Sequence, residues 1–96
     1  MPFIKLFGGL RRIARFAGIR TNGNTVREAI DALGAYNPAL WDAILDGERL
    51  RSHVRVMVNG HDIELGSGLD TPVSTDDQIA IFPPMAGGAS GIGESV

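Results

Sequence analysis

The stretch Gln78–Phe82, followed at once by two prolines, constrains the fold more than any other part of the chain. Ile79 and Ile81 alternate with residues that would face the opposite side, which is the period-two pattern of a half-buried strand. Pro83 and Pro84 lack backbone N–H donors and have a restricted φ, so neither can continue a hydrogen-bonded sheet. The sequence therefore predicts a strand that ends at Phe82 and a chain that leaves it in an extended conformation.

The residues that follow the prolines are mostly small. Ala86, Gly87 and Gly88 have almost no side-chain bulk, so this part of the backbone could enter a narrow channel. A tail of this kind suits an active site on another protein that must reach a main-chain carboxyl group. Residues 89–96 come after the diglycine, so Gly88 is not the last residue of the sequence.

Composition limits the chemistry that the chain could perform. Its 96 residues predict one small domain with a modest core. The absence of cysteine excludes disulfides, thiolate metal sites and a cysteine nucleophile. Two histidines, His53 and His61, are too few for a histidine-based metal site without help from carboxylates. No serine has a histidine and an acid at a recognisable spacing, and we interpret Asp76 and Asp77 as a solvated turn. The residues therefore predict no catalytic constellation and no metal ligand in this chain.

Charge and hydropathy bear on partners and location. The net charge of −2 disfavours nucleic acid as a partner. No apolar run approaches the ~20 residues of a membrane span, and Lys5 interrupts an N-terminus that does not resemble a signal peptide. We therefore expect no membrane partner and a cytoplasmic location. Six cations precede the first acid, Glu28, which leaves open a solvated face or a docking patch for an acidic partner. They are Lys5, Arg11, Arg12, Arg15, Arg20 and Arg27.

The first half of the chain carries two strand patterns and one helix signature. Residues 3–7 predict a strand with Ile4 and Leu6 on one side, residues 10–14 a turn or short helix, and residues 15–21 a second strand. Thr25 and Glu28 form a capping-box pattern at the start of the main helix. We expect that helix to run to about Leu33 and to end at Gly34.

A second, shorter helix is predicted after Asn37, because Pro38 suits a first helical turn. We expect it to close at Asp46 and Gly47. Trp41, the only tryptophan, lies on its apolar side and is interpreted as an anchor in the core.

The second half predicts strands again. Residues 54–58 form the clearest strand, with valines on the core face, and Asn59-Gly60 is a tight hairpin turn that leads into a return segment at 61–63. With the last strand, Gln78–Phe82, this order predicts an α+β fold. It would contain a mixed sheet with one main helix packed on one face and a second short helix.

Three segments of the chain resemble the MoaD-type ubiquitin-like sulfur carriers of bacteria and archaea. They are residues 54–63, 68–72 and 78–88, and the last ends in Ile-Phe-Pro-Pro-Met-Ala-Gly-Gly. This family includes the small subunit of molybdopterin synthase (MoaD) and its thiamine-pathway relative ThiS. The resemblance covers residues 3–88 and implies the β-grasp fold of ubiquitin over residues 1–86. Residues 87–96 would be a flexible diglycine tail with a C-terminal extension.

The resemblance also implies a mechanism. A partner related to the ubiquitin-activating enzymes would use magnesium and ATP to adenylate the carboxylate of Gly88, next to Gly87. Sulfur from a persulfide would then displace AMP and leave a thiocarboxylate, which donates sulfur at an acceptor synthase large subunit or another sulfurtransferase target. In this reading the chain is a carrier or the non-catalytic small subunit of a synthase. It binds no cofactor itself, because ATP and magnesium belong to the activating partner.

An exposed apolar surface beside the tail is expected to bind these partners. Phe7, Met57 and Phe82 would lie on the sheet face opposite the core, on strands that are neighbours in a β-grasp sheet. The resemblance extends this surface along the tail to Pro83, Pro84, Met85 and Ala86. The alternative is that a second layer or a second copy of the chain covers the patch.

The extension after the diglycine leaves two explanations. In the favoured one the chain is a precursor, and a peptidase, with a zinc metalloprotease of the JAMM type as the natural candidate, cuts between Gly88 and Ala89. In the other the extension is a remnant without a role. A rival function is a ubiquitin-like modifier that joins Gly88 to lysines of target proteins, and a third is a β-grasp interaction module whose tail is never activated. Lys5 is the only lysine, so side-chain-linked chains of this protein would have to use it.

Overall fold

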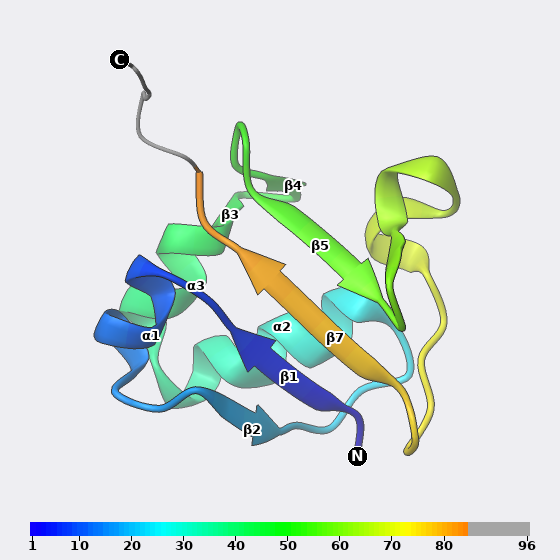
Figure 1. Cartoon of the computed structure of the whole chain (residues 1–96), viewed down its shortest axis with the longest axis horizontal. Helices are drawn as coiled ribbons and strands as arrows, with labels where there is room; N and C mark the ends of the chain where they lie inside the picture. Colours follow the sequence, from blue (N-terminus) through cyan, green and yellow to red (C-terminus); the bar gives the residue numbers. More distant parts are fainter. Residues whose placement is uncertain (85–96) are drawn as a thin grey trace.

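The computed structural model describes residues 1–84 and contains one main sheet (Figure 1). Its strands lie in the order β2-β1-β7-β5-β6. The central strands β1 and β7 are parallel and the other neighbours are antiparallel, so the sheet is mixed, as predicted. The five strands are β1 (Phe3–Leu6), β2 (Gly18–Arg20), β5 (Arg55–Val58), β6 (His61–Asp62) and β7 (Gln78–Phe82).

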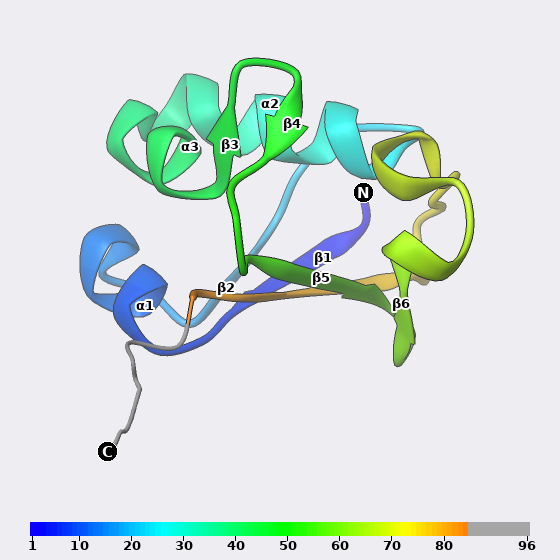
Figure 2. The same ribbon diagram turned by 90° about the horizontal axis from the view of Figure 1, so that it is seen from above.

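Three helices lie on one face of this sheet (Figure 2). They are α1 (Gly9–Ala14), the main helix α2 (Val26–Tyr36) and α3 (Pro38–Ile44). Two short 3₁₀ helices, Ile63–Leu65 and Gly68–Asp70, connect β6 to β7. The inward-facing side chains of β1, β5 and β7 pack against α2 and α3 and form the core, which confirms the predicted arrangement of sheet and helices. The largest fully buried side chains are Ile4, Leu6, Ile30, Leu33, Leu40, Ile44, Leu45, Ile79, Ile81, Val26 and Val56.

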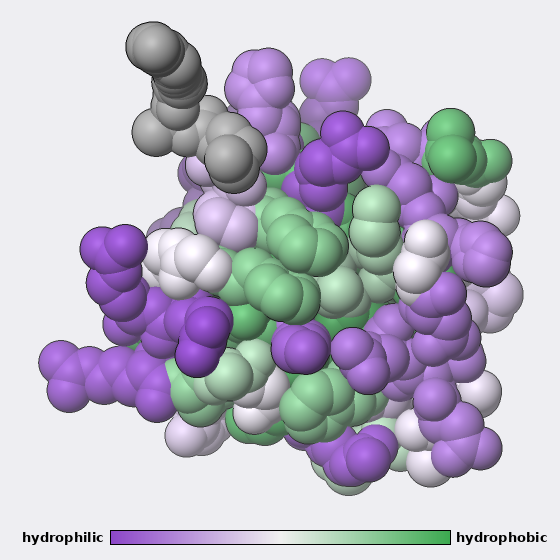
Figure 3. Space-filling model, viewed as in Figure 1, coloured by the Kyte–Doolittle hydropathy of each residue, from purple (hydrophilic) through white to green (hydrophobic). Residues whose placement is uncertain are grey.

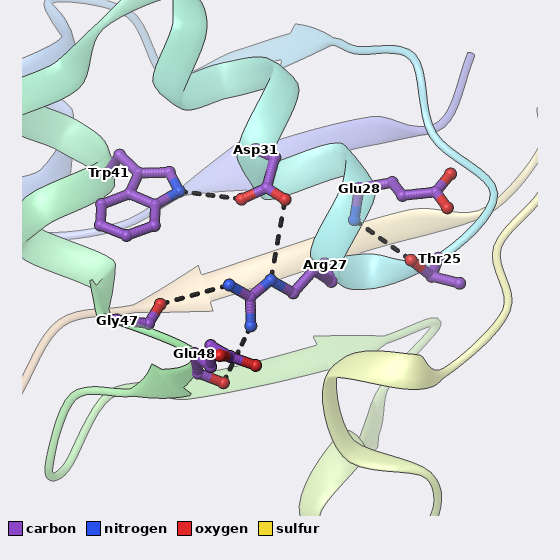
Figure 4. Close-up of polar contacts among 7 residues, drawn as sticks. All are labelled: Thr25, Arg27, Glu28, Asp31, Trp41, Gly47 and Glu48. Carbon is purple, nitrogen blue, oxygen red and sulfur yellow. Dashed lines mark hydrogen bonds and ion pairs between the residues drawn. The ribbon is translucent and has the colours of Figure 1, made fainter.

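The start of α2 follows the predicted capping pattern with one change. The hydroxyl of Thr25 accepts a hydrogen bond from the backbone N–H of Glu28 at 3.1 Å (Figure 4). The Glu28 carboxylate accepts from the N–H of Asn24 at 2.9 Å, one residue before the helix cap that a capping box would use. The bond to Glu28 N–H satisfies a donor that a helix N-terminus leaves unpaired, and the two bonds together set where the main helix begins.

The predicted end of α2 at Gly34 is wrong, because the helix continues to Tyr36. Gly34 does not end the helix but allows close packing between two helices. A Cβ atom at this position would lie 2.3 Å from Cδ1 of Trp41, so the missing side chain lets α3 approach α2 closely. Trp41 packs against the core from a half-buried position, and its indole N–H donates to Asp31 at 2.9 Å (Figure 4).

A small hairpin, β3 (Leu45–Asp46) and β4 (Arg49–Leu50), follows α3 and was not predicted. Arg27 on α2 holds its turn by donating to the carbonyl oxygens of Glu48 at 2.9 Å and Gly47 at 3.3 Å (Figure 4). The sequence predicts that Asp46 and Gly47 close the second helix, but Asp46 is the last residue of β3 and the turn is formed by Gly47 and Glu48.

The second strand is shorter than predicted. Residues 15–21 were expected to be extended, but β2 contains only Gly18–Arg20. Arg15 has a left-handed backbone with φ 67° and ends α1, so the chain turns before it can pair. Gly18 begins this strand, and its missing Cβ makes room for the ring of Phe3 on β1.

The predicted turn at Asn59-Gly60 joins β5 to β6, and a polar network ties it to the turn before β7. The Asp77 carboxylate accepts from the side-chain amide of Asn59 at 2.8 Å and from the backbone N–H of Ser74 at 2.8 Å. These hydrogen bonds hold the pKa of Asp77 below its usual value, and the bond from Asn59 has the largest effect. The network fixes one end of β7.

This network predicts a pH-dependent stability. The pKa of Asp77 is lower in the folded chain than in the unfolded one, so the charged carboxylate stabilises the fold above the unfolded value of about 4. That contribution disappears as the pH falls through the lowered folded pKa. We expect Asp77→Asn to reduce the free energy of unfolding in urea at pH 7, and to make little difference at a pH where Asp77 is already protonated. Asp76→Asn, in the same exposed turn, is the matched control and should behave like the wild type. Equal losses for Asp77→Asn at neutral and acid pH would contradict this account.

Candidate docking surface and tail base

The face of the sheet opposite the helices is open in the part of the chain that the structure describes. Alternation along the central strands sends one set of side chains into the core and the other set outward. No helix of residues 1–84 covers the outward set (Figure 2). Hydrophobic side chains gather on this face over β1, β7 and β5 and are surrounded by hydrophilic ones (Figure 3). The outward apolar residues of these strands, with Phe7 just after β1, are Phe3, Phe7, Met57, Ala80 and Phe82.

Two aromatic rings form the centre of this surface nearest the tail. The N–H of Phe7 donates to the carbonyl oxygen of Ile81 at 3.2 Å, so the pairing of β1 with β7 continues one residue beyond β1. This contact brings Phe7 beside Phe82, and their rings stack with centroids 4.4 Å apart and planes 12° from parallel. Both side chains remain half-buried. A stacked pair that is half-buried at the surface presents a flat, rigid apolar area, which is typical of an interaction site.

Met57 completes the set of predicted surface residues. It is paired with Ala80 across β5 and β7, so it lies one diagonal step from Phe82 on the same face. The structure thus brings Phe7, Met57 and Phe82 together on three adjacent strands, although they are far apart in sequence. We call the surface formed by these three residues and Ala80 the sheet patch.

The base of the tail rests against the turn between β1 and α1. Pro83 is half-buried and Pro84 is exposed. Gly8 has a positive φ of 56°, and a Cβ atom there would lie 2.8 Å from Cγ of Pro83. A glycine at position 8 therefore allows Pro83 to sit close against this turn. Five residues of the predicted tail site lie outside the described residues: Met85, Ala86, Gly87, Gly88 and Ala89.

Sequence reasoning missed Gly8 as a site residue. In the sequence, Gly8-Gly9 follows the first predicted strand and indicates only its end. Two glycines in succession were the available signal, but the proline that Gly8 contacts is 75 positions further along the chain, and only the parallel pairing of β1 with β7 brings them together.

Cations lie on and beside the sheet patch. Lys5 is exposed between Gly18 and Ala80, its neighbours on the adjacent strands, and its ammonium is 5.4 Å from the centroid of the Phe7 ring. The Arg20 guanidinium lies 5.6 Å from the Phe3 ring. Both distances are within the range of a cation–π attraction.

The described residues contain no cluster of three or more histidine, cysteine, aspartate or glutamate side chains that could hold a metal ion. In residues 1–84, no helix has both the length and the apolar composition needed to cross a membrane. The site that the structure does offer is a surface: a rigid apolar patch that leads directly into the base of the C-terminal tail.

Comparison with known proteins agrees with this arrangement. The model of the ThiS family matches residues 4–88. Small archaeal modifier protein 1 of Haloferax volcanii is 36% identical over 89 residues, which is 88% of this chain and 97% of that protein.

Solved structures give the same result. A chain in the crystal structure of the Amycolatopsis orientalis BexX/CysO complex superposes with a TM-score of 0.83 and 26% identity, covering 92% of this chain and 100% of that one. Small archaeal modifier protein 1 from Methanosarcina acetivorans has a TM-score of 0.79 and 29% identity, covering 90% of this chain and 94% of that one.

The sheet topology, the helix packing and these neighbours define a ubiquitin-like β-grasp protein. The chain belongs to the ThiS family, within a group of small ubiquitin-like carriers and modifiers. The fold and the family predicted from the sequence are therefore confirmed.

Proposed function

We propose that this chain is a sulfur carrier precursor whose active form ends at Gly88. The observation that carries the proposal is the continuity of the sheet patch with the tail base: the stacked pair of Phe7 and Phe82 is followed directly by Pro83 and Pro84. A partner that binds the patch would hold the tail at a fixed distance from its own active site. Residues 1–86 would be the docking domain, and residues 87–96 the tail with a removable extension.

The chemistry requires a free carboxylate at Gly88. A peptidase, for which a zinc enzyme of the JAMM type is the candidate, would first cut the bond between Gly88 and Ala89. The Gly88 carboxylate would then attack the α-phosphorus of ATP on an activating enzyme, and pyrophosphate would leave. A persulfide sulfur would attack the acyl carbon and displace AMP, and a thiol would cleave the S–S bond to release the thiocarboxylate. The mixed anhydride is needed because a carboxylate alone resists nucleophiles.

The catalytic groups for these steps belong to the partners in this proposal. Magnesium and ATP would be bound by the activating enzyme, and zinc by the peptidase. The contribution of this chain is positional: a rigid patch to dock and a thin backbone, Gly87-Gly88, to enter the activating site. The thiocarboxylate would then serve a molybdopterin-type or related sulfuration in the cytoplasm, at a synthase large subunit or another sulfurtransferase target.

A second candidate function is protein modification. The relatives called small archaeal modifier proteins favour it, since one is 36% identical to this chain. In that case the activated Gly88 carbonyl would be attacked by a lysine amine of a target protein, with loss of AMP and formation of an isopeptide bond. The two functions share the activation step and differ in the nucleophile that follows it.

Intact mass spectrometry of the protein from its native host tests the proposal. We expect a species that ends at Gly88, heavier than the free acid by the mass difference between sulfur and oxygen. Proteolysis of the same lysate should release diglycine-tagged lysine peptides from other proteins only if modification also occurs. Recovery of the full-length chain alone, while sulfuration pathways are active, would overturn the precursor and the carrier together.

A further inference from the structure

Lys5 and the arginines before position 27 form no ion pair within the described residues. The two ion pairs in this part of the structure are Arg27 with Asp31 at 3.7 Å and Arg55 with Asp62 at 2.8 Å. Neither involves the N-terminal segment of the chain, which carries five cations before position 27 and no acid before Glu28. The chain as a whole is nevertheless negative. The N-terminal segment is therefore positive, and the excess of negative charge lies in the rest of the chain.

Lys5 is the cation nearest the centre of the patch. Its cross-strand neighbours, Gly18 and Ala80, are too small to cover it and carry no charge. The acid on the same face, Asp62, is already bound by Arg55 on β5. The other eight basic residues of the chain are arginines, so Lys5 is also its single lysine. An ammonium in the middle of an apolar docking surface must remain hydrated or meet a carboxylate when that surface is covered.

A second group of cations lies beside the tail base. Arg11, Arg12 and Arg15 are exposed and line a groove of about 450 Å³. Gly8, which contacts Pro83, lies in the same groove, so these arginines are next to the point where the tail leaves the fold. Phe16 and Ala17 complete the lining.

We propose that the surface which binds the sheet patch is acidic, with one carboxylate opposite Lys5 and others opposite the arginines of α1. This inference rests on the proposed function, because it describes the activating enzyme that would take the tail. Burying the patch against an apolar surface alone would strip water from Lys5 without replacement, which costs free energy. A carboxylate opposite Lys5 removes that cost, and acidic groups near α1 add attraction before contact.

Two properties of binding follow. Oppositely charged surfaces associate faster, and salt reduces the gain, because charges further apart than about 10 Å are screened at 0.1 M ionic strength. The charge at Lys5 also supplies specificity. A partner with a cation at the matching position would meet like-charge repulsion, even though the apolar part of the two surfaces fits.

The test compares three charge-reversal variants that have the same net charge. The chain ending at Gly88 is assayed with the activating enzyme of its own host, by ATP–pyrophosphate exchange at 50 mM and 500 mM salt. Lys5→Glu and Arg12→Glu reverse charges at the patch and on α1. Arg49→Glu makes the same change in net charge on β4, on the helix side of the sheet, where no side-chain ion pair is formed among the described residues. Circular dichroism checks that each variant is folded, and Lys5→Gln provides a variant with the charge removed instead of reversed.

We expect Lys5→Glu to lower kcat/KM about 10-fold or more at 50 mM salt. Arg49→Glu should stay within about twofold of the wild type. Arg12→Glu and Lys5→Gln should have effects between those of Lys5→Glu and Arg49→Glu. The differences should shrink at 500 mM salt. Equal rates for Lys5→Glu and Arg49→Glu, with an active wild type, would overturn the acidic partner and leave the carrier function standing. A wild type that is neither bound nor activated would overturn both.

Discussion

Replacing Phe82 by alanine in the chain that ends at Gly88 should lower kcat/KM for activation about 30-fold, mainly by raising KM. Phe82 stacks on Phe7 at 4.4 Å and lies immediately before Pro83, so its loss removes the aromatic centre of the sheet patch closest to the tail. Truncation of an aromatic hot spot typically costs about 2 kcal/mol of binding, which corresponds to roughly 30-fold. ATP–pyrophosphate exchange over a range of carrier concentrations separates the effect on KM from that on kcat.

Phe3→Ala is the matched control for this prediction. Phe3 is also a half-buried aromatic residue on the outer face, but it lies opposite Gln78, at the end of the sheet away from the tail. We expect it to change KM by less than about threefold, as most residues away from a hot spot do. Thermal unfolding of both variants corrects for any loss of folded protein. Equal effects of the two substitutions would show that binding does not centre on the tail end of the patch.

Gly8→Ala should reduce kcat about 10-fold while leaving KM nearly unchanged. The new Cβ would lie 2.8 Å from Cγ of Pro83, so the tail base would have to move away from the β1–α1 turn. The sheet patch would still dock, but the tail would leave in another direction, and a misplacement of about 1 Å can cost orders of magnitude in rate. The same exchange assay measures both constants.

Gly47→Ala is the control for backbone strain at Gly8. Gly47 has a φ of 63°, close to the 56° of Gly8, but a Cβ atom there meets nothing within 4 Å. Both substitutions should lower the free energy of unfolding by about 1 kcal/mol or more, because alanine is strained at a positive φ. Gly8, with a ψ of −135°, should lose at least as much as Gly47. Only Gly8→Ala should affect kcat. Since Pro83→Ala removes the atom that clashes, the double variant should recover part of the lost rate. No recovery, or an equal loss of kcat in Gly47→Ala, would contradict a role for Gly8 in directing the tail.

Local patterns in the sequence determined much of the fold. Alternation predicted β7 with its observed bounds, Gln78–Phe82, and the turn residues Asn59-Gly60 predicted the hairpin of β5 and β6. Thr25 and Glu28 marked the start of α2. These predictions succeeded because each depends on the conformations of a few neighbouring residues: side-chain period, positive φ in a tight turn, and unpaired donors at a helix end.

The predictions from the sequence were wrong where a contact from a distant residue determines the local structure. Gly34 continues α2 instead of ending it because Trp41 fills the space where its side chain would be. Gly47 lies in the turn of a hairpin, which Arg27 on α2 holds, and does not simply close α3. In both cases a glycine has two local uses, and a contact from another element selects one of them.

The candidate site divides in the same way. The sequence by itself determined which residues would face outward on each strand, and that the strand before the prolines would lead into a diglycine segment, because side-chain alternation and the missing donors of Pro83 and Pro84 are local properties. Only the tertiary structure decided which strands are neighbours. Parallel pairing of β1 with β7 stacks Phe7 on Phe82 and seats Pro83 against Gly8. Strand order is set by the burial of the whole core, which no short segment of sequence encodes.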